Sequence, residues 1–351
     1  MRPGRNLLLA LSLLGAIAGG CNALWGVDEL GYAGPSGDST TSTGGGGAAG
    51  GHGGSGAATT GGAGGSAASG GSAGAGGSPC ELGPFGPATP LTEVNTSDGE
   101  WDPAVSNNEL TLYFSSPRTG GLGLGDIWFA TRTVVTDPFG PVQNLWDVNS
   151  SYADMDPELA PNELTIYWAV QTPAGTGNLD IWTASRVSVT QAFGTPVELP
   201  GVNTIYDDRD PTLSADGLTV YFTSDRPGGA GSDDIWTAQR SGPSAPFGTA
   251  QLVSVASTSV ADANPALSSD GLALYFDTSA SGGAGERDIW VVTRDSLAAP
   301  FGAMQNIGVP NTSDGDFDPA ISADGRTLYF ASNRLSGSGG GDLWRATRSC
   351  E

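Results

Sequence analysis

Hydrophobic and polar residues alternate in short runs through the C-terminal part of this chain, and no stretch carries a helical periodicity. A clear example is the turn Asp216-Gly217 followed by residues 218–222, because Asp-Gly between alternating runs is a typical hairpin signal. Further short runs lie before this turn, after a glycine-rich loop and after a polar loop, at residues 211–214, 235–238 and 247–253. The pattern predicts a unit of four short β-strands.

This unit occurs five times with a constant step of 54 residues and without an insertion or deletion. An Asp or Asn precedes proline at Asp102, Asp156, Asp210, Asn264 and Asp318. Triplets of Asp-Ile-Trp or Asp-Leu-Trp begin at Asp126, Asp180, Asp234, Asp288 and Asp342, and Phe-Gly pairs at Phe85, Phe139, Phe193, Phe247 and Phe301. Repeats of such length mark repeat architectures, and four-stranded units favour a β-propeller. We therefore expect an all-β fold with five four-stranded blades.

The motif D-P-x-x-S-x-D-G-x-x-x-Y-F followed by D-I-W-x-A resembles the WD40-like propeller repeat of the TolB family. The resemblance covers about residues 82–351 and implies a scaffold for binding rather than a reaction. The first two units depart from it, with Asn108-Glu109 and Asn162-Glu163 where the others have Asp-Gly. TolB itself has six blades and a separate domain, whereas five units are found in this chain.

The phase of the repeat predicts how the ring closes. The repeat region starts with a Phe-Gly strand and ends with an Asp-Leu-Trp strand, so we expect the N-terminal strand to complete the last blade. Cys80 and Cys350 fall at the same register of the repeat, in the loop between the third and fourth strands. In an exported protein this coincidence predicts a disulfide between them, which the chain-entropy model values at roughly 5 kcal/mol.

The N-terminus reads as an export signal, with Arg2 and Arg5, an apolar stretch over residues 7–17 and small residues up to Cys21. The segment before Cys21 resembles the lipobox of bacterial lipoproteins, which implies a signal peptide over residues 1–20 and acylation of the Cys21 thiol. Ordinary signal cleavage nearby, with Cys21 a spare thiol, is the alternative. By the same resemblance Asn22 favours the outer membrane, with the domain facing the periplasm or the cell surface.

The next regions divide by composition. Residues 21–33 form a short segment, and residues 34–79 consist almost entirely of Gly, Ala, Ser and Thr. Such a stretch buries too little apolar surface to offset its ordering entropy, so we expect a disordered linker. The predicted propeller then spans residues 80–351.

The charge of the chain restricts its partners. The formal net charge is −23, with 37 acidic residues against 14 basic ones, and the printed sequence contains no lysine. Such a surface repels nucleic-acid phosphates and anionic lipid headgroups, which excludes nucleic acid and leaves the lipid anchor as the only membrane contact. An envelope protein or a glycan remains as the expected partner.

The chemistry open to the propeller is that of carboxylates and hydroxyls. His52, the only histidine, lies in the linker, so Ser-His-Asp or Cys-His catalysis, Schiff bases and His-ligated zinc each lack an essential group. Acids recur in the pattern acid-x-acid-Pro. Their members are Glu100, Asp154, Asp208, Asp262 and Asp316, each followed two residues later by Asp102, Asp156, Asp210, Asn264 or Asp318.

A spacing of two places both side chains on one side of an extended segment, so we expect nine carboxylates at one mouth of the channel. Oxygen ligands in that number suit Ca²⁺ or Mg²⁺. The alternative is structural: each acid bonds local backbone or an arginine, for which Arg118, Arg226 and Arg334 are candidates.

The repeat is interrupted by Glu158, Asp277 and Glu286, which are candidates for a functional role. Five-bladed propellers also host glycoside hydrolases, and such an enzyme needs two carboxyls about 5–9.5 Å apart. Nothing in the sequence identifies such a pair. The sequence therefore predicts a non-catalytic binding module of the cell envelope, with a glycosidase and a purely structural envelope component as the alternatives.

Overall fold

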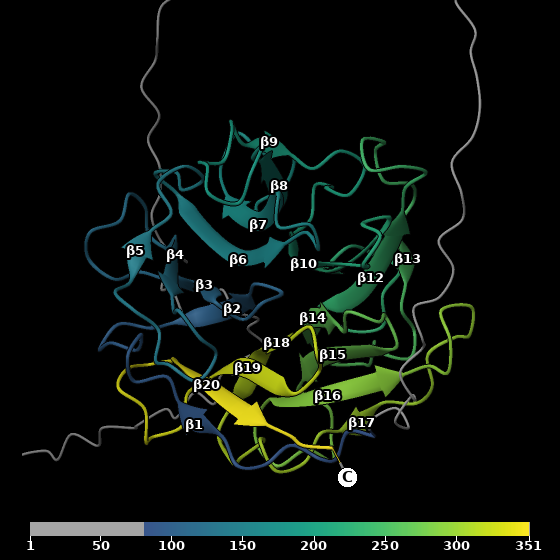
Figure 1. The fold of residues 1–351 in the computed structure, drawn as a ribbon. Coiled ribbons are helices and arrows are strands. Elements are labelled where there is room, and N and C mark those ends of the chain that lie inside the picture. The colour runs from purple at the N-terminus through teal and green to yellow at the C-terminus, as the bar shows by residue number, and fades with distance from the viewer. Residues whose placement is uncertain (1–80, 351) are drawn as a thin grey trace, which may run out of the picture. The chain divides into compact units, whose positions relative to one another are not determined.

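The structure is a computed structural model in which residues 81–350 are described. These residues belong to one compact unit, Cys80–Glu351. They form twenty strands in five antiparallel sheets of four, arranged as a five-bladed β-propeller (Figure 1). The predicted fold class is confirmed. The predicted signal peptide, segment 21–33, linker 34–79, Cys21 and Cys80 all lie outside the described residues. No helix of the described chain is long and apolar enough to cross a membrane.

Each blade runs from an innermost to an outermost strand. The first blade consists of β2 (Trp101–Val105), β3 (Thr111–Ser116), β4 (Asp126–Thr131) and β5 (Gln143–Asn144), and the second of β6 (Ala153–Leu159), β7 (Thr165–Gln171), β8 (Asp180–Ser185) and β9 (Val197–Glu198). The third blade consists of β10 (Asp208–Leu213), β11 (Thr219–Ser224), β12 (Asp234–Gln239) and β13 (Gln251–Leu252). The fourth consists of β14 (Asp262–Leu267), β15 (Ala273–Thr278), β16 (Asp288–Thr293) and β17 (Gln305–Asn306). The fifth blade is β18 (Asp316–Ile321), β19 (Thr327–Ser332), β20 (Asp342–Thr347) and β1 (Thr89–Pro90). The innermost strands begin earlier, and the outermost ones are shorter, than the sequence predicts.

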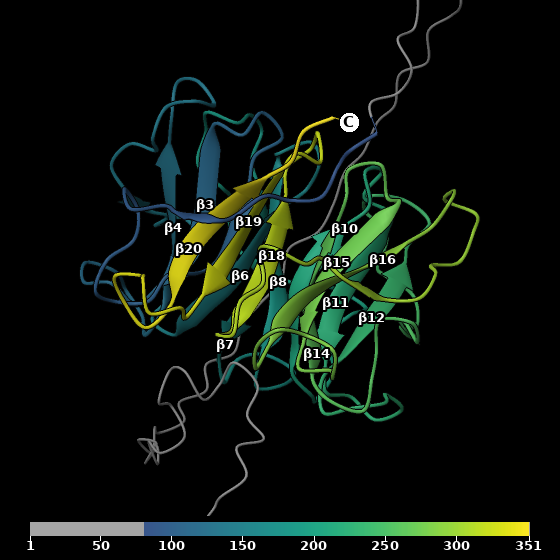
Figure 2. The same ribbon diagram turned by 90° about the horizontal axis from the view of Figure 1, so that it is seen from below.

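The N-terminal strand completes the last blade, as the phase of the repeat predicts. Thr89 pairs with Arg345 and Pro90 with Trp344, and Figure 2 shows the blue N-terminal segment beside yellow β20. The Asn95 side chain brackets the same strand, because its amide donates to the Leu343 carbonyl at 3.0 Å and its oxygen accepts from the Leu343 N–H at 2.9 Å. Backbone hydrogen bonds between residues far apart in the sequence therefore close the ring.

Cys350 lies at this closure. The backbone of Cys350 forms an isolated antiparallel β-bridge with that of Leu82, so the end of the described chain lies beside its start. Because Cys80 lies outside the described residues, its pairing with Cys350 stays a prediction.

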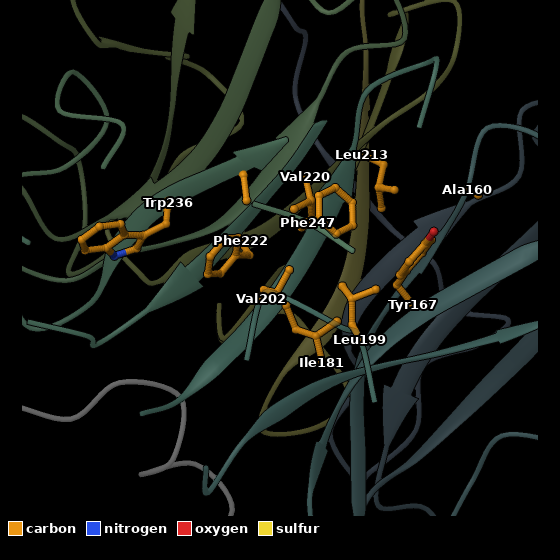
Figure 3. Close-up of a cluster of buried hydrophobic side chains, with 11 residues drawn as sticks. Ala160, Tyr167, Ile181, Leu199, Val202, Leu213, Val220, Phe222, Trp236 and Phe247 are labelled. Atoms are coloured by element: carbon orange, nitrogen blue, oxygen red, sulfur yellow. The ribbon is translucent and has the colours of Figure 1, made fainter. Parts of the chain in front are cut away.

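The core lies between blades rather than at the centre of the ring. In one cluster, Tyr167 and Ile181 of the second blade pack against Val220, Phe222 and Trp236 of the third (Figure 3). Each repeat thus buries its apolar side chains only when a neighbouring repeat covers them, which explains the regularity of the 54-residue unit.

A β-bulge interrupts every innermost strand. In β10 the pairing with β11 shifts register between Arg209 and Thr212, and the other four blades show the same shift. At the bulge, the residue before proline adopts a left-handed backbone conformation, with φ between 53° and 55° at Asp102, Asp156, Asp210, Asn264 and Asp318. Asp and Asn are the non-glycine residues that best tolerate this conformation, which explains their recurrence before proline.

Candidate binding site in the central channel

A cavity of about 140 Å³ lies in the channel formed by the five innermost strands. Its floor is a ring of Asp102, Asp156, Asp210, Asn264 and Asp318, which we call the inner ring. Above it, Glu158 and Thr212 interrupt an otherwise small and apolar layer. Next follows an apolar collar of Val105, Leu159, Leu213, Leu267 and Ile321. The mouth lies at the hairpin turns, where Asn107, Ala215 and Ser269 are exposed.

The inner ring is linked from blade to blade by hydrogen bonds. The Asp102 N–H donates to Asp318 Oδ2 at 3.3 Å, and the Asp156 N–H donates to Asp102 Oδ2 at 3.3 Å. The Asn264 N–H likewise donates to Asp210 Oδ2 at 3.2 Å. Each of these carboxylates therefore accepts from the backbone of the next blade, which gives the repeated side chain a structural role.

One link runs differently, because blade four carries Asn264 in the ring. There the Asp318 N–H donates to Asp277 Oδ2 at 3.0 Å, and the Asn264 amide donates to the same oxygen at 2.6 Å. Asp277 also forms an ion pair with Arg287. The off-pattern Asp277 on β15 thus stabilises the ring by accepting hydrogen bonds from two of its residues, and it does not line the cavity.

The charge of the inner ring is only partly compensated. Arg209 Nε lies 3.6 Å from Asp210 Oδ2, and Arg209 also pairs with Asp233 at 3.0 Å. The remaining three acids of the ring are Asp102, Asp156 and Asp318, and Arg209 lowers the pKa of Asp156 against the larger effect of burial.

Burial and mutual repulsion perturb these three carboxyls. Burial raises the pKa of Asp102, Asp156 and Asp318, and for Asp156 and Asp318 the neighbouring ring carboxylates raise the pKa further, to well above its usual range. Asp318 exposes only 5% of its surface. The raised pKa values favour the protonated forms of Asp156 and Asp318, which then donate to neighbouring ring carboxylates, Asp156 to Asp210 and Asp318 to Asp102. The floor of the cavity is therefore a hydrogen-bonded ring of buried carboxyls.

Glu158 is the off-pattern acid that does line the cavity. Its Oε1 accepts from the Thr212 hydroxyl at 3.2 Å, and burial in the channel wall raises its pKa to about 7. The other candidate, Glu286, is exposed in the loop before β16 and does not reach the channel.

Five of the ten acid-x-acid-Pro positions do not reach the cavity. Glu100, Asp154, Asp208, Asp262 and Asp316 are fully buried, and none of them lines it. The bulge before each proline interrupts the two-residue alternation of side chains, so the two members of a pair diverge. The expectation of nine carboxylates at one mouth is therefore corrected to four acids of the inner ring, with Glu158 above them.

Three of these five buried acids form ion pairs with arginines of their own blades. Glu100 pairs with Arg118 at 2.7 Å, and Arg226 and Arg334 form the matching ion pairs with Asp208 and Asp316. The three arginines are those that the sequence offered as structural partners.

In blade two, which lacks this arginine, Trp168 Nε1 donates to Asp154 at 3.1 Å, and burial raises the Asp154 pKa to about 6. This contact accounts for a tryptophan where the other blades have phenylalanine.

The predicted metal site lacks a matching ligand cluster, since the described residues contain no group of three or more His, Cys, Asp or Glu arranged to hold an ion.

Sequence reasoning missed the apolar collar. The signal was present, because a large aliphatic residue follows each Asp-Pro or Asn-Pro position at the same spacing in every unit.

No protein-family model and no curated protein matches the sequence. Several solved structures resemble the propeller. A thermostable family-43 glycoside hydrolase matches with a TM-score of 0.50 and 16% identity, over 73% of this chain and 92% of its own. An α-L-arabinofuranosidase from Lactobacillus brevis matches with a TM-score of 0.49 and 12% identity, over 75% of this chain and 92% of its own. TolB from Acinetobacter baumannii matches with a TM-score of 0.43 and 16% identity over 71% of this chain. The match spans only 54% of the length of that TolB chain. Identities this low show the fold alone.

Proposed function

We propose that this protein is an exported, lipid-anchored propeller that binds a partner protein at the mouth of its central channel and catalyses no reaction. The observation that carries the proposal is the cavity itself, which combines an exposed mouth, an apolar collar and a floor of buried acids. Rigid scaffolds commonly present their binding residues on loops, and the turns around Asn107, Ala215 and Ser269 surround this mouth.

The size of the cavity favours a protein side chain over a free ligand. Sites for small molecules usually measure about 300–1,000 Å³. At about 140 Å³ the channel has less than half of that volume, so it accommodates one inserted side chain more readily than a glycan unit with its hydration. The rest of the interface is then formed by the surrounding turns.

A glycosidase is the rival function, and Glu158 is the observation in its favour. A carboxyl whose pKa is about 7 suits a general acid, and other carboxyls lie below it in the cavity. Three of the inner-ring acids, Asp318, Asp102 and Asp210, however, accept hydrogen bonds from backbone N–H groups of the next blade. The fold shared with glycoside hydrolases does not by itself transfer their activity.

Two parallel assays of the full chain test the proposal. In the first, the immobilised protein captures envelope extract, and we expect one protein to be recovered reproducibly. In the second, a panel of glycosides and oligosaccharides is assayed for turnover, and we expect none. Glu158→Gln provides the diagnostic variant and Glu286→Gln, at an exposed acid outside the channel, the matched control. Turnover that Glu158→Gln abolishes and Glu286→Gln preserves would replace the binding function with a glycosidase.

A further inference from the structure

We infer that a groove between the first and second blades is a second binding site, and that it takes a neutral saccharide whose sugar ring stacks on Trp146. The groove measures about 600 Å³, and it shares no lining residue with the cavity of the central channel. A volume of that size falls within the usual range of about 300–1,000 Å³ for small-molecule sites. Because the two sites are separate, the inference goes beyond the function proposed for the channel.

One wall of the groove is a face of the first blade. Tyr113, Phe129 and Gln143 lie opposite one another on β3, β4 and β5, so their side chains share one face of the sheet. The ring centres of Tyr113 and Phe129 are 6.0 Å apart, and the rings are inclined by 31°. Trp146 follows β5 in the chain, lines the same groove and exposes 57% of its surface. The groove therefore has an aromatic wall that solvent reaches.

The opposite wall is the segment after β8 of the second blade, and its arginine is held in place. Arg186 donates from Nε to the Glu163 carbonyl at 3.0 Å, and its guanidinium carbon lies 4.4 Å from the centre of the Phe193 ring. Arg186 also donates a hydrogen bond to the Tyr113 hydroxyl, which links the two walls. These contacts fix the shape of the groove before a ligand arrives, and such preorganisation lowers the cost of binding.

The residues that distinguish this groove are those that interrupt the repeat, whereas Tyr113 and Arg186 recur in every unit and serve the fold. Phe129 stands where the other blades have Thr183, Thr237, Val291 and Arg345. Trp146 stands where they have Thr92, Pro200, Ser254 and Gly308. Ala192 replaces the proline that precedes Phe-Gly in the other four units, and its smaller side chain leaves more room in the groove. Folding leaves Trp146 largely in water, so a ligand explains this residue better than the core does.

The polar residues of the groove select an uncharged ligand rich in hydroxyl groups. Asp147 and Arg186 place opposite charges in one groove, which favours neither an anion nor a cation. The net charge of −23 disfavours an anion further. Gln143 and Gln191 are exposed, and each amide can donate and accept hydrogen bonds. A sugar ring offers hydroxyls at its edge for such groups, and its C–H groups pack against the electron-rich face of an indole ring.

Calorimetric titration of the full chain with cellotetraose, xylotetraose, maltotetraose and chitotetraose tests the site. We expect saturable binding of at least one of these probes at millimolar concentration, and Trp146→Ala should weaken it by about tenfold or more. Trp146→Phe keeps an aromatic face and should retain most of the affinity. Because Trp146 is largely exposed, Trp146→Ala should fold with an unchanged melting temperature. Tyr152→Ala removes an exposed aromatic residue outside the groove, so it is the matched control and should bind as the wild type does.

Two results of the titration would overturn the saccharide site. One is the absence of binding by every probe at millimolar concentration, and the other is binding that Trp146→Ala leaves unchanged. Capture from envelope extract tests the channel separately, because Trp146 does not line it, and Trp146→Ala should recover the partner protein as the wild type does. Loss of that capture without any saccharide binding would assign the groove to the protein interface instead.

Discussion

Replacing Glu158 by glutamine should stabilise the protein above neutral pH and have little effect in acid. Burial raises the Glu158 pKa from 4.5 to about 7, and a rise of this size corresponds to about 3 kcal/mol of unfavourable free energy for the ionised side chain. Because the folded-state pKa lies above the unfolded-state value, stability is fully present below pH 4.5 and is lost as the pH rises towards 7. Glutamine stays neutral and retains an oxygen that can accept from the Thr212 hydroxyl.

The assay is thermal or denaturant unfolding of the wild-type and Glu158→Gln proteins from pH 4 to pH 8. At pH 8 we expect the variant to be more stable by about 3 kcal/mol, or roughly 5–10 °C in melting temperature, and the two curves should converge near pH 4. Glu286→Gln, which removes an exposed charge, controls for the change in net charge. A difference between Glu158→Gln and wild type that is the same at pH 4 and pH 8 would refute the reasoning, because a packing effect does not titrate.

Three further predictions concern the blades and the two ends of the chain. Arg226→Ala should cost about 3–5 kcal/mol in denaturant unfolding, because it leaves the buried Asp208 carboxylate unpaired; a loss below 1 kcal/mol would show that the ion pair is dispensable. Non-reducing mass spectrometry of the exported protein should recover linked Cys80 and Cys350 peptides, and reduction should lower the melting temperature; free thiols at both positions would contradict the disulfide. Cys21→Ser should move the protein from the membrane fraction to the soluble fraction, and unchanged fractionation would rule out the lipid anchor.

The sequence by itself determined the architecture, because a propeller is built from contacts that repeat. A constant 54-residue step forces equivalent residues into equivalent places, so five blades of four strands follow from the positions of the Asp-Pro, Asp-Gly and Asp-Ile-Trp motifs. The phase of the repeat even predicted which strand completes the last blade. Arg118 ends a Ser-x-Arg pattern that returns in the third and fifth units, so the sequence could offer it as a partner for the repeated acids, and the structure pairs it with Glu100.

The tertiary structure decided which acids form a site. From the sequence, Asp208 and Asp210 are equivalent, since a spacing of two points side chains to the same side of a regular strand. The left-handed residue and the bulge before proline break that regularity, so Asp208 pairs with Arg226 inside the blade while Asp210 reaches the channel. Glu158 acquires its raised pKa only because five strands converge and exclude water around it. The left-handed conformation of the residue before proline and the desolvation of Glu158 both depend on the closed ring. Neither can be read from the local pattern of residues.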